Sequence, residues 1–72
     1  MKVILDEKII MWLMNNIKDY NIYLEVKSNL EDVIRHYYLI WKDCDIKEIQ
    51  FNYLGKRFRI IPMILYLQIQ FF

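Results

Sequence analysis

The segment 47–61, KEIQFNYLGKRFRII, decides the fold, because apolar and polar residues alternate on both sides of Leu54 and Gly55. This alternation is typical of half-buried strands and predicts a β-hairpin with strands at 47–53 and 57–61. The expected partners are Phe51 with Phe58, Ile49 with Ile60, and Gln50 with Arg59. A slip of one residue would mix the two faces, so the register is well specified. Since Leu54-Gly55 is not a preferred hairpin dipeptide, a four-residue loop over 53–56 with the same register stays open.

One more strand is expected after the hairpin. Pro62 and Met63 interrupt the pattern, and residues 64–71 then alternate again. This segment has high β-propensity and no charge, so it would aggregate if it lay exposed at a sheet edge. We therefore expect a symmetric strand-to-strand dimer to cover it. The expected dimer edge consists of Leu65, Leu67, Ile69, Phe71 and Phe72.

The residues before the hairpin predict two helices and a strand. Residues 6–20 have helical periodicity with Asp6 as the N-cap, and residues 22–27 alternate like a strand. Ser28 and Glu31 form a capping box for a second helix that ends near residue 43. Residues 1–5 suit a short edge strand, and residues 22–53 a parallel strand–helix–strand crossover. The predicted fold is α+β, with two helices packed on one face of a small, mostly antiparallel sheet in the order α-β-α-β-β-β.

Length and composition favour one compact domain, residues 1–72, that associates with something else. Hydrophobic residues make up 57% of the 72 residues. The core of so small a chain rarely supplies more than about 3–5 kcal/mol without a disulfide, a metal or oligomerisation. Cys44 is the only cysteine and His36 the only histidine, so the sequence contains neither an internal disulfide nor a familiar Cys/His metal cluster. We therefore expect a homodimer, whose interface would add to the limited stability of the core, and we expect no cofactor.

The sequence indicates a cytoplasmic protein. It has a single cysteine, no signal-like N-terminus, and no apolar run near the roughly 20 residues of a membrane span. The net charge of +1 argues against a strongly basic nucleic-acid coat and against an acidic mimic of DNA.

Two places invite a catalytic interpretation, and both have simpler ones. Asp32 precedes His36 by four residues and could orient its imidazole, but an exposed ion pair at helical spacing explains the same pattern. Cys44 lies between two aspartates, which disfavour a thiolate, so we expect it in a helix-ending turn with its side chain in the core. The sequence therefore predicts a protein that is not an enzyme.

A basic hairpin tip supports one of two binding hypotheses. Lys56, Arg57 and Arg59 are expected to share the sheet face away from the helices with further polar and aromatic residues. The expected companions are Tyr23, Lys27, Asn52, Tyr66, Gln68 and Gln70. Arginines and aromatics on an open sheet bind RNA in some domains, so a small nucleic-acid-binding protein is the alternative function.

The favoured hypothesis is a non-catalytic protein-binding regulator or inhibitor that blocks a larger partner sterically. Met11, Trp12 and Leu39 project away from the predicted core stripes and would anchor the partner. The basic residues Lys56, Arg57 and Arg59 would orient it at the rim. In size, biased composition and lack of a catalytic motif, the chain resembles the small accessory proteins of phages and mobile elements, such as anti-CRISPR and other anti-defence inhibitors.

Overall fold

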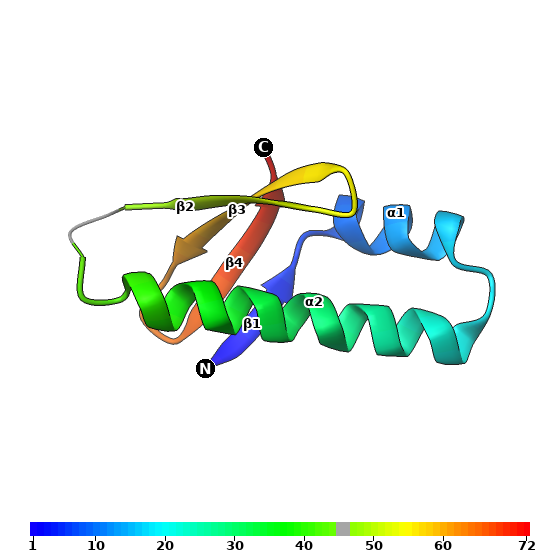
Figure 1. The fold of residues 1–72 in the computed structure, drawn as a ribbon, viewed down its shortest axis with the longest axis horizontal. Helices are drawn as coiled ribbons and strands as arrows, with labels where there is room; N and C mark the ends of the chain where they lie inside the picture. Colours follow the sequence, from blue (N-terminus) through cyan, green and yellow to red (C-terminus); the bar gives the residue numbers. More distant parts are fainter. Residues whose placement is uncertain (45–46) are drawn as a thin grey trace.

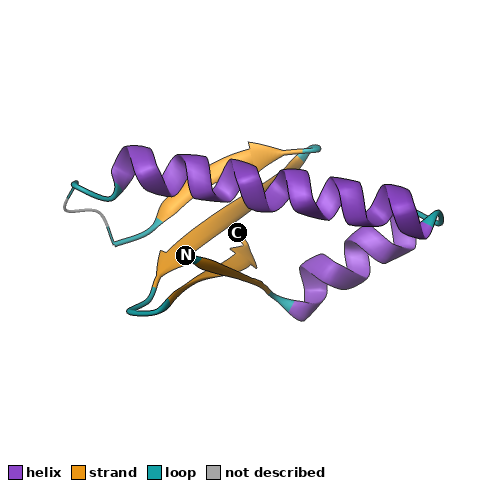
Figure 2. Cartoon of the chain, turned by 90° about the horizontal axis from the view of Figure 1, so that it is seen from below, coloured by secondary structure: helices purple, strands orange, loops and turns teal. Residues whose placement is uncertain are grey.

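The computed structural model describes residues 1–44 and 47–72 and shows an α+β fold (Figure 1). The elements are β1 (Lys2–Leu5), α1 (Glu7–Asn16), α2 (Tyr20–Trp41), β2 (Ile49–Tyr53), β3 (Lys56–Pro62) and β4 (Tyr66–Phe71). The two helices pack on one face of the sheet, which confirms the predicted fold class (Figure 2). The order is β-α-α-β-β-β, because the expected edge strand at the N-terminus forms and the strand expected between the helices does not.

The sheet has the strand order β1-β4-β3-β2. β1 runs parallel to β4, and the other two pairs of neighbours are antiparallel. The predicted hairpin register is confirmed: Phe51 pairs with Phe58, Ile49 with Ile60, and Gln50 with Arg59. The parallel crossover expected over residues 22–53 is wrong, since the parallel pair instead joins the first strand to the last.

A two-residue turn closes the hairpin. Tyr53 pairs with Lys56, which leaves only Leu54 and Gly55 in the loop. Their φ values are 51° and 76°. Two positive φ angles in succession are typical of a type I′ turn, whose twist matches that of the flanking strands. The four-residue alternative is therefore excluded.

The strand predicted at 22–27 is wrong, because these residues form the N-terminal part of the 22-residue helix α2. The Asp19 side chain caps this helix by accepting hydrogen bonds from the backbone N–H groups of Asn21 (2.9 Å) and Ile22 (3.1 Å). Ser28, predicted as an N-cap, lies inside the helix. Tyr23 and Leu30, one heptad apart, are both buried, so a 3.6-residue period continues through the segment that seemed to alternate.

β4 is an interior strand, so the expected dimer edge is wrong. β4 is bonded to β1 on one side and to β3 on the other. Leu67 and Ile69 are fully buried in the core, and Leu65 precedes the strand in the β3–β4 turn. The fold thus protects this uncharged segment by enclosing both of its edges within one chain. β1 and β2 are the outer strands.

The core lies between the helices and the sheet. Its fully buried side chains are Ile9, Leu13, Leu30, Ile34, Phe58, Ile60, Leu67 and Ile69. Each helix contributes two of them, and the two inner strands contribute the other four. The opposite face of the sheet has no described element over it.

Removing the helix cap at Asp19 should destabilise the protein. We expect Asp19→Ala to lower the free energy of unfolding by about 1 kcal/mol, since two backbone N–H groups lose their acceptor. The control Glu25→Ala, at an exposed position inside α2, should change it by less than about 0.5 kcal/mol. Urea titration followed by circular dichroism measures both. Equal losses would contradict the cap.

Leu54→Asn should stabilise the hairpin. Leu54 is held at a positive φ that asparagine tolerates far better, and its side chain is mostly exposed. We expect a gain of about 1 kcal/mol in the free energy of unfolding. Leu54→Ala removes the same apolar side chain without relieving the backbone, so it should give no gain. A gain of the same size in both variants would show that relief of the backbone is not the cause.

Candidate interaction surfaces

The residues considered for catalysis do not form a site. The carboxylate of Asp32 lies 3.5 Å from the guanidinium of Arg35, and the exposed His36 ring lies against Tyr37 with its centroid 6.4 Å away. Cys44 is exposed, so its predicted place in the core is wrong. Asp45, one of its neighbours, lies outside the described residues. Within 1–44 and 47–72, no three histidine, cysteine or carboxylate side chains are grouped as metal ligands.

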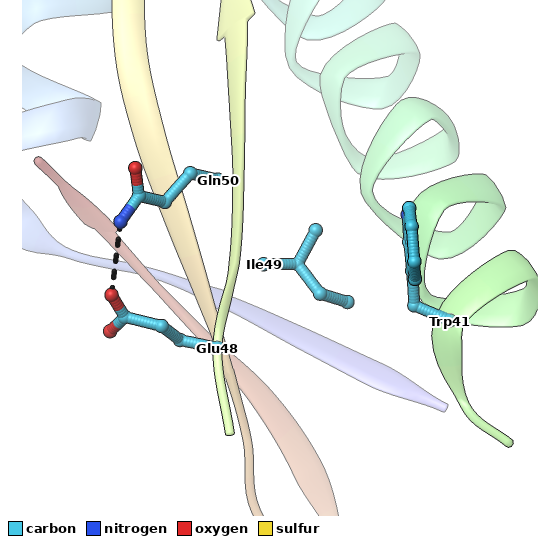
Figure 3. A pocket seen from close by; sticks show the side chains of 4 residues that line it. All are labelled: Trp41, Glu48, Ile49 and Gln50. Atoms are coloured by element: carbon cyan, nitrogen blue, oxygen red, sulfur yellow. Dashed lines mark hydrogen bonds between the residues drawn. The ribbon is translucent and has the colours of Figure 1, made fainter. Parts of the chain in front are cut away.

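A shallow hollow lies between the end of α2 and the start of β2 (Figure 3). Ile49 points toward Trp41, while Glu48 and Gln50 point to the other side of the strand and share a hydrogen bond of 3.1 Å. The volume of the hollow is about 160 Å³. Ligand pockets usually measure at least about 300 Å³, so this hollow is too small for a typical small-molecule site.

The three predicted anchors are not brought together. Trp12 does not project from the molecule as predicted, because it is half-buried with its ring centroid 6.0 Å from Phe58 and 5.6 Å from Phe71. Met11 is exposed on α1, and Leu39 is exposed near the C-terminal end of α2. α1 lies beside the N-terminal half of α2, so Met11 and Leu39 lie toward opposite ends of the long helix (Figure 1).

A different apolar cluster, here called the apolar end, lies where β1 begins and β3 turns into β4. Its members are Met1, Leu39, Met63, Ile64 and Leu65, and all five are exposed. The pairing of Lys2 with Tyr66 places Met1 next to Leu65 in the register. Met1 and Leu39 line one small cavity of about 130 Å³, so α2 joins the cluster.

The β3–β4 turn is the most prominent part of the apolar end. Ile64 is 93% exposed and Leu65 is 81% exposed. The turn is closed by a hydrogen bond of 2.8 Å from the Met63 N–H to the Tyr66 carbonyl. Arg35 borders the cluster, because its Nε donates to the Met1 carbonyl at 3.2 Å. The result is a convex apolar tip with one arginine at its margin.

A second surface, here called the open face, is the side of the sheet away from the helices. Its strand positions follow from alternation with the buried residues: Lys2, Ile4, Gln50, Asn52, Arg57, Arg59, Ile61, Tyr66, Gln68 and Gln70. The phenyl ring of Phe72 joins them, because the Cζ atoms of Arg57 and Arg59 lie 5.4 and 5.0 Å from its centroid.

Most of the polar set predicted for this face is present, with three exceptions. Tyr23 and Lys27 belong to α2, and Tyr23 is buried there. Lys56 pairs with Tyr53 and shares the side of the sheet on which Phe51 and Phe58 face the core. Arg57 and Arg59 are therefore the two basic residues of the predicted tip that reach the open face.

No protein-family model, curated protein or solved structure matches this chain. Among the described residues, no helix combines the length and the hydropathy needed to cross a membrane.

Proposed function

We propose that this chain is a non-catalytic protein-binding regulator that uses the apolar end to occupy a groove on a larger protein and blocks it sterically. The observation that carries the proposal is the exposure of Ile64 and Leu65 at the tip of a turn. Turns usually place polar residues in water, and contiguous exposed apolar residues are typical of interaction sites.

The shape and composition of the apolar end fit a wedge. Two aliphatic side chains project from a turn, with Met1, Leu39 and Met63 around them. Methionine is enriched at interfaces, and its flexible side chain adapts to irregular surfaces. A convex apolar tip fits a concave apolar groove in the partner, and burying the tip removes both side chains from water.

Arg35 replaces the predicted rim residues in this proposal. Lys56 starts β3, while the apolar end follows its last residue, Pro62, so the predicted basic rim lies one strand length away. Arg35 borders the apolar end and makes ion pairs of 3.6 Å with Glu31 and 3.5 Å with Asp32. Exposed pairs such as these contribute little to stability, which leaves the guanidinium available to orient a partner.

We further propose that the protein acts in the cytoplasm as an accessory protein of a phage or mobile element, such as an anti-CRISPR or another anti-defence inhibitor. The small size of the chain supports this class. So does a composition with 13 isoleucines and neither alanine nor threonine, which is typical of AT-rich genes.

Replacing the tip should abolish partner binding without unfolding the protein. We expect Ile64→Ser with Leu65→Ser to leave the free energy of unfolding within about 0.5 kcal/mol, since neither side chain belongs to the core. Immobilised wild type should retain one stoichiometric protein from nuclease-treated host lysate, and the purified pair should re-form a complex that the double variant does not form. The control, Met11→Ser with Met14→Ser, removes two exposed methionines of α1 and should bind normally. Equal binding by the tip variant would refute the docking role.

We also propose a weak homodimer, now through β2 rather than β4. The Arg57 carbonyl accepts the Phe72 N–H at 2.9 Å, so the backbone groups of Arg57 point toward β4. Asn52 is the partner of Arg57 in β2, and in an antiparallel pair the backbone groups of opposite residues point either both toward each other or both away. The backbone groups of Asn52 therefore point outward, away from β3. The same holds for Gln50, two residues away, because this direction alternates along a strand. A twofold axis at Phe51 would pair Gln50 with the second copy's Asn52, making four hydrogen bonds. β2 also has none of the charges or prolines that usually block edge pairing.

Asn52→Pro should dissociate this dimer. Proline removes an outward N–H and is tolerated on an outer strand, whereas Asn52→Thr keeps the N–H. Four backbone hydrogen bonds supply only about 2–6 kcal/mol, so we expect concentration-dependent association by sedimentation velocity for wild type and the threonine variant. The proline variant should remain monomeric. A monomeric wild type, or a proline variant that still associates, would exclude pairing through β2.

A further inference from the structure

The distribution of charge over the sheet points to a second binding site. The four strands contain four basic residues, Lys2, Lys56, Arg57 and Arg59, and no acidic residue, although the chain has nine acidic residues in all. Three of the four, all except Lys56, belong to the open face. Glu48 precedes β2, and its Oε2 lies 3.8 Å from the Nη1 of Arg59. The open face is therefore positive in a chain whose net charge is only +1.

Arg57 and Arg59 form an incomplete anion site. Both guanidinium groups lie against the ring of Phe72, which is itself more than half exposed. The Nε of Arg59 is buried and has no acceptor among the described residues. Two neighbouring guanidinium groups suit the oxygens of a phosphate, which guanidinium groups bind through paired hydrogen bonds.

The neighbouring side chains suit nucleobases. Gln50 and Gln70 flank Arg59 in one row across the sheet, and Asn52 lies beside Arg57 in the next row. Planar amides can donate to and accept from base edges, and an exposed phenyl ring can stack on a base. An acidic peptide would satisfy the arginines but would offer no planar base to the exposed part of the Phe72 ring.

We propose that the open face binds single-stranded nucleic acid, with Arg57 and Arg59 on the phosphates and Phe72 stacked on a base. A duplex hides its bases inside the stack, and a four-stranded sheet face cannot enter its major groove as a helix does. Lys2 lies on the same face beside Tyr66, four rows along β4 from Gln70, the neighbour of Arg59, so the arginine pair is the basic part of the site. Because two arginines bind the phosphates, the affinity should fall as the salt concentration rises, with a slope of about −0.7 per phosphate neutralised.

The test is fluorescence anisotropy with a labelled oligo(U) of about 10 nucleotides, a length within the range that single-strand-binding OB folds cover. A duplex of the same length and a polyglutamate peptide of the same charge serve as comparison probes. Wild type should bind the oligo(U) more tightly than either. Arg57→Gln with Arg59→Gln should weaken binding at least tenfold and reduce the salt slope by about 1.4.

Three further variants separate this site from general attraction between charges. Lys8→Gln with Lys18→Gln removes the same charge from exposed positions outside the sheet and should change affinity by less than about twofold. Phe72→Leu should weaken binding several-fold at an unchanged salt slope, because it removes stacking but no charge. Glu48→Gln should strengthen binding, because it removes the carboxylate beside Arg59. No binding by wild type, equal losses in the two double variants, or tighter binding of polyglutamate would overturn the proposal.

Discussion

The parallel pairing of β1 with β4 is the constraint on which the rest of the structure depends. It brings the two ends of the chain into one sheet, with Val3 beside Leu67 and Leu5 beside Ile69. The Asp6 N–H continues the pairing by donating to the Ile69 carbonyl at 2.9 Å, so α1 starts directly from the sheet. Without β1, the uncharged strand β4 would be an edge, which is the arrangement most prone to aggregation. Both candidate surfaces depend on this pairing, since it places Met1 beside the β3–β4 turn and Lys2 on the open face.

The sequence predicted the parts of the fold that depend on neighbouring residues. The β2–β3 hairpin was predicted to the residue because its strands are adjacent and only one register separates apolar from polar positions. The partner of β1 was not predicted, since a parallel pairing 64 positions apart in the chain (Lys2 with Tyr66) leaves no local signal. Residues 22–27 were predicted as a strand because a segment of only six residues fits both the two-residue period of a strand and the 3.6-residue period of a helix. Asp19, which accepts hydrogen bonds from two N–H groups of α2, was the signal that could have decided between them.

The candidate surfaces were also predicted correctly only where the residues that form them are close together in the sequence. Arg57 and Arg59 were predicted on the open face because they alternate with Phe58 in one strand. The prediction for Lys56 was wrong because the same alternation places it on the side that faces the helices. Leu39 and Leu65 were both named, but in separate roles, and only the long-range pairing of β1 shows that they belong to one cluster. Ile64 was missed, although the wholly apolar run 62–65 at a chain reversal was a usable signal. Trp12 was misjudged because a flanking helix position can face either water or a neighbouring aromatic cluster.

The two helices cover one side of the sheet, and this arrangement separates the arginine pair of the open face from the apolar end. β3 runs from the β2–β3 turn to the β3–β4 turn. The apolar end includes the β3–β4 turn, while Arg57 lies beside the β2–β3 turn at the other end of the strand. The side chains of the open face are directed away from the helices, and Leu39 belongs to α2 on the opposite side. A partner protein held at the apolar end would therefore leave the Arg57–Arg59 pair uncovered. Lys2 and Tyr66 adjoin the apolar end, but Arg57 and Arg59 lie toward the other end of β3. Substitutions of Ile64 and Leu65 should therefore not change binding at the arginine pair, since distant sites without common contacts behave additively.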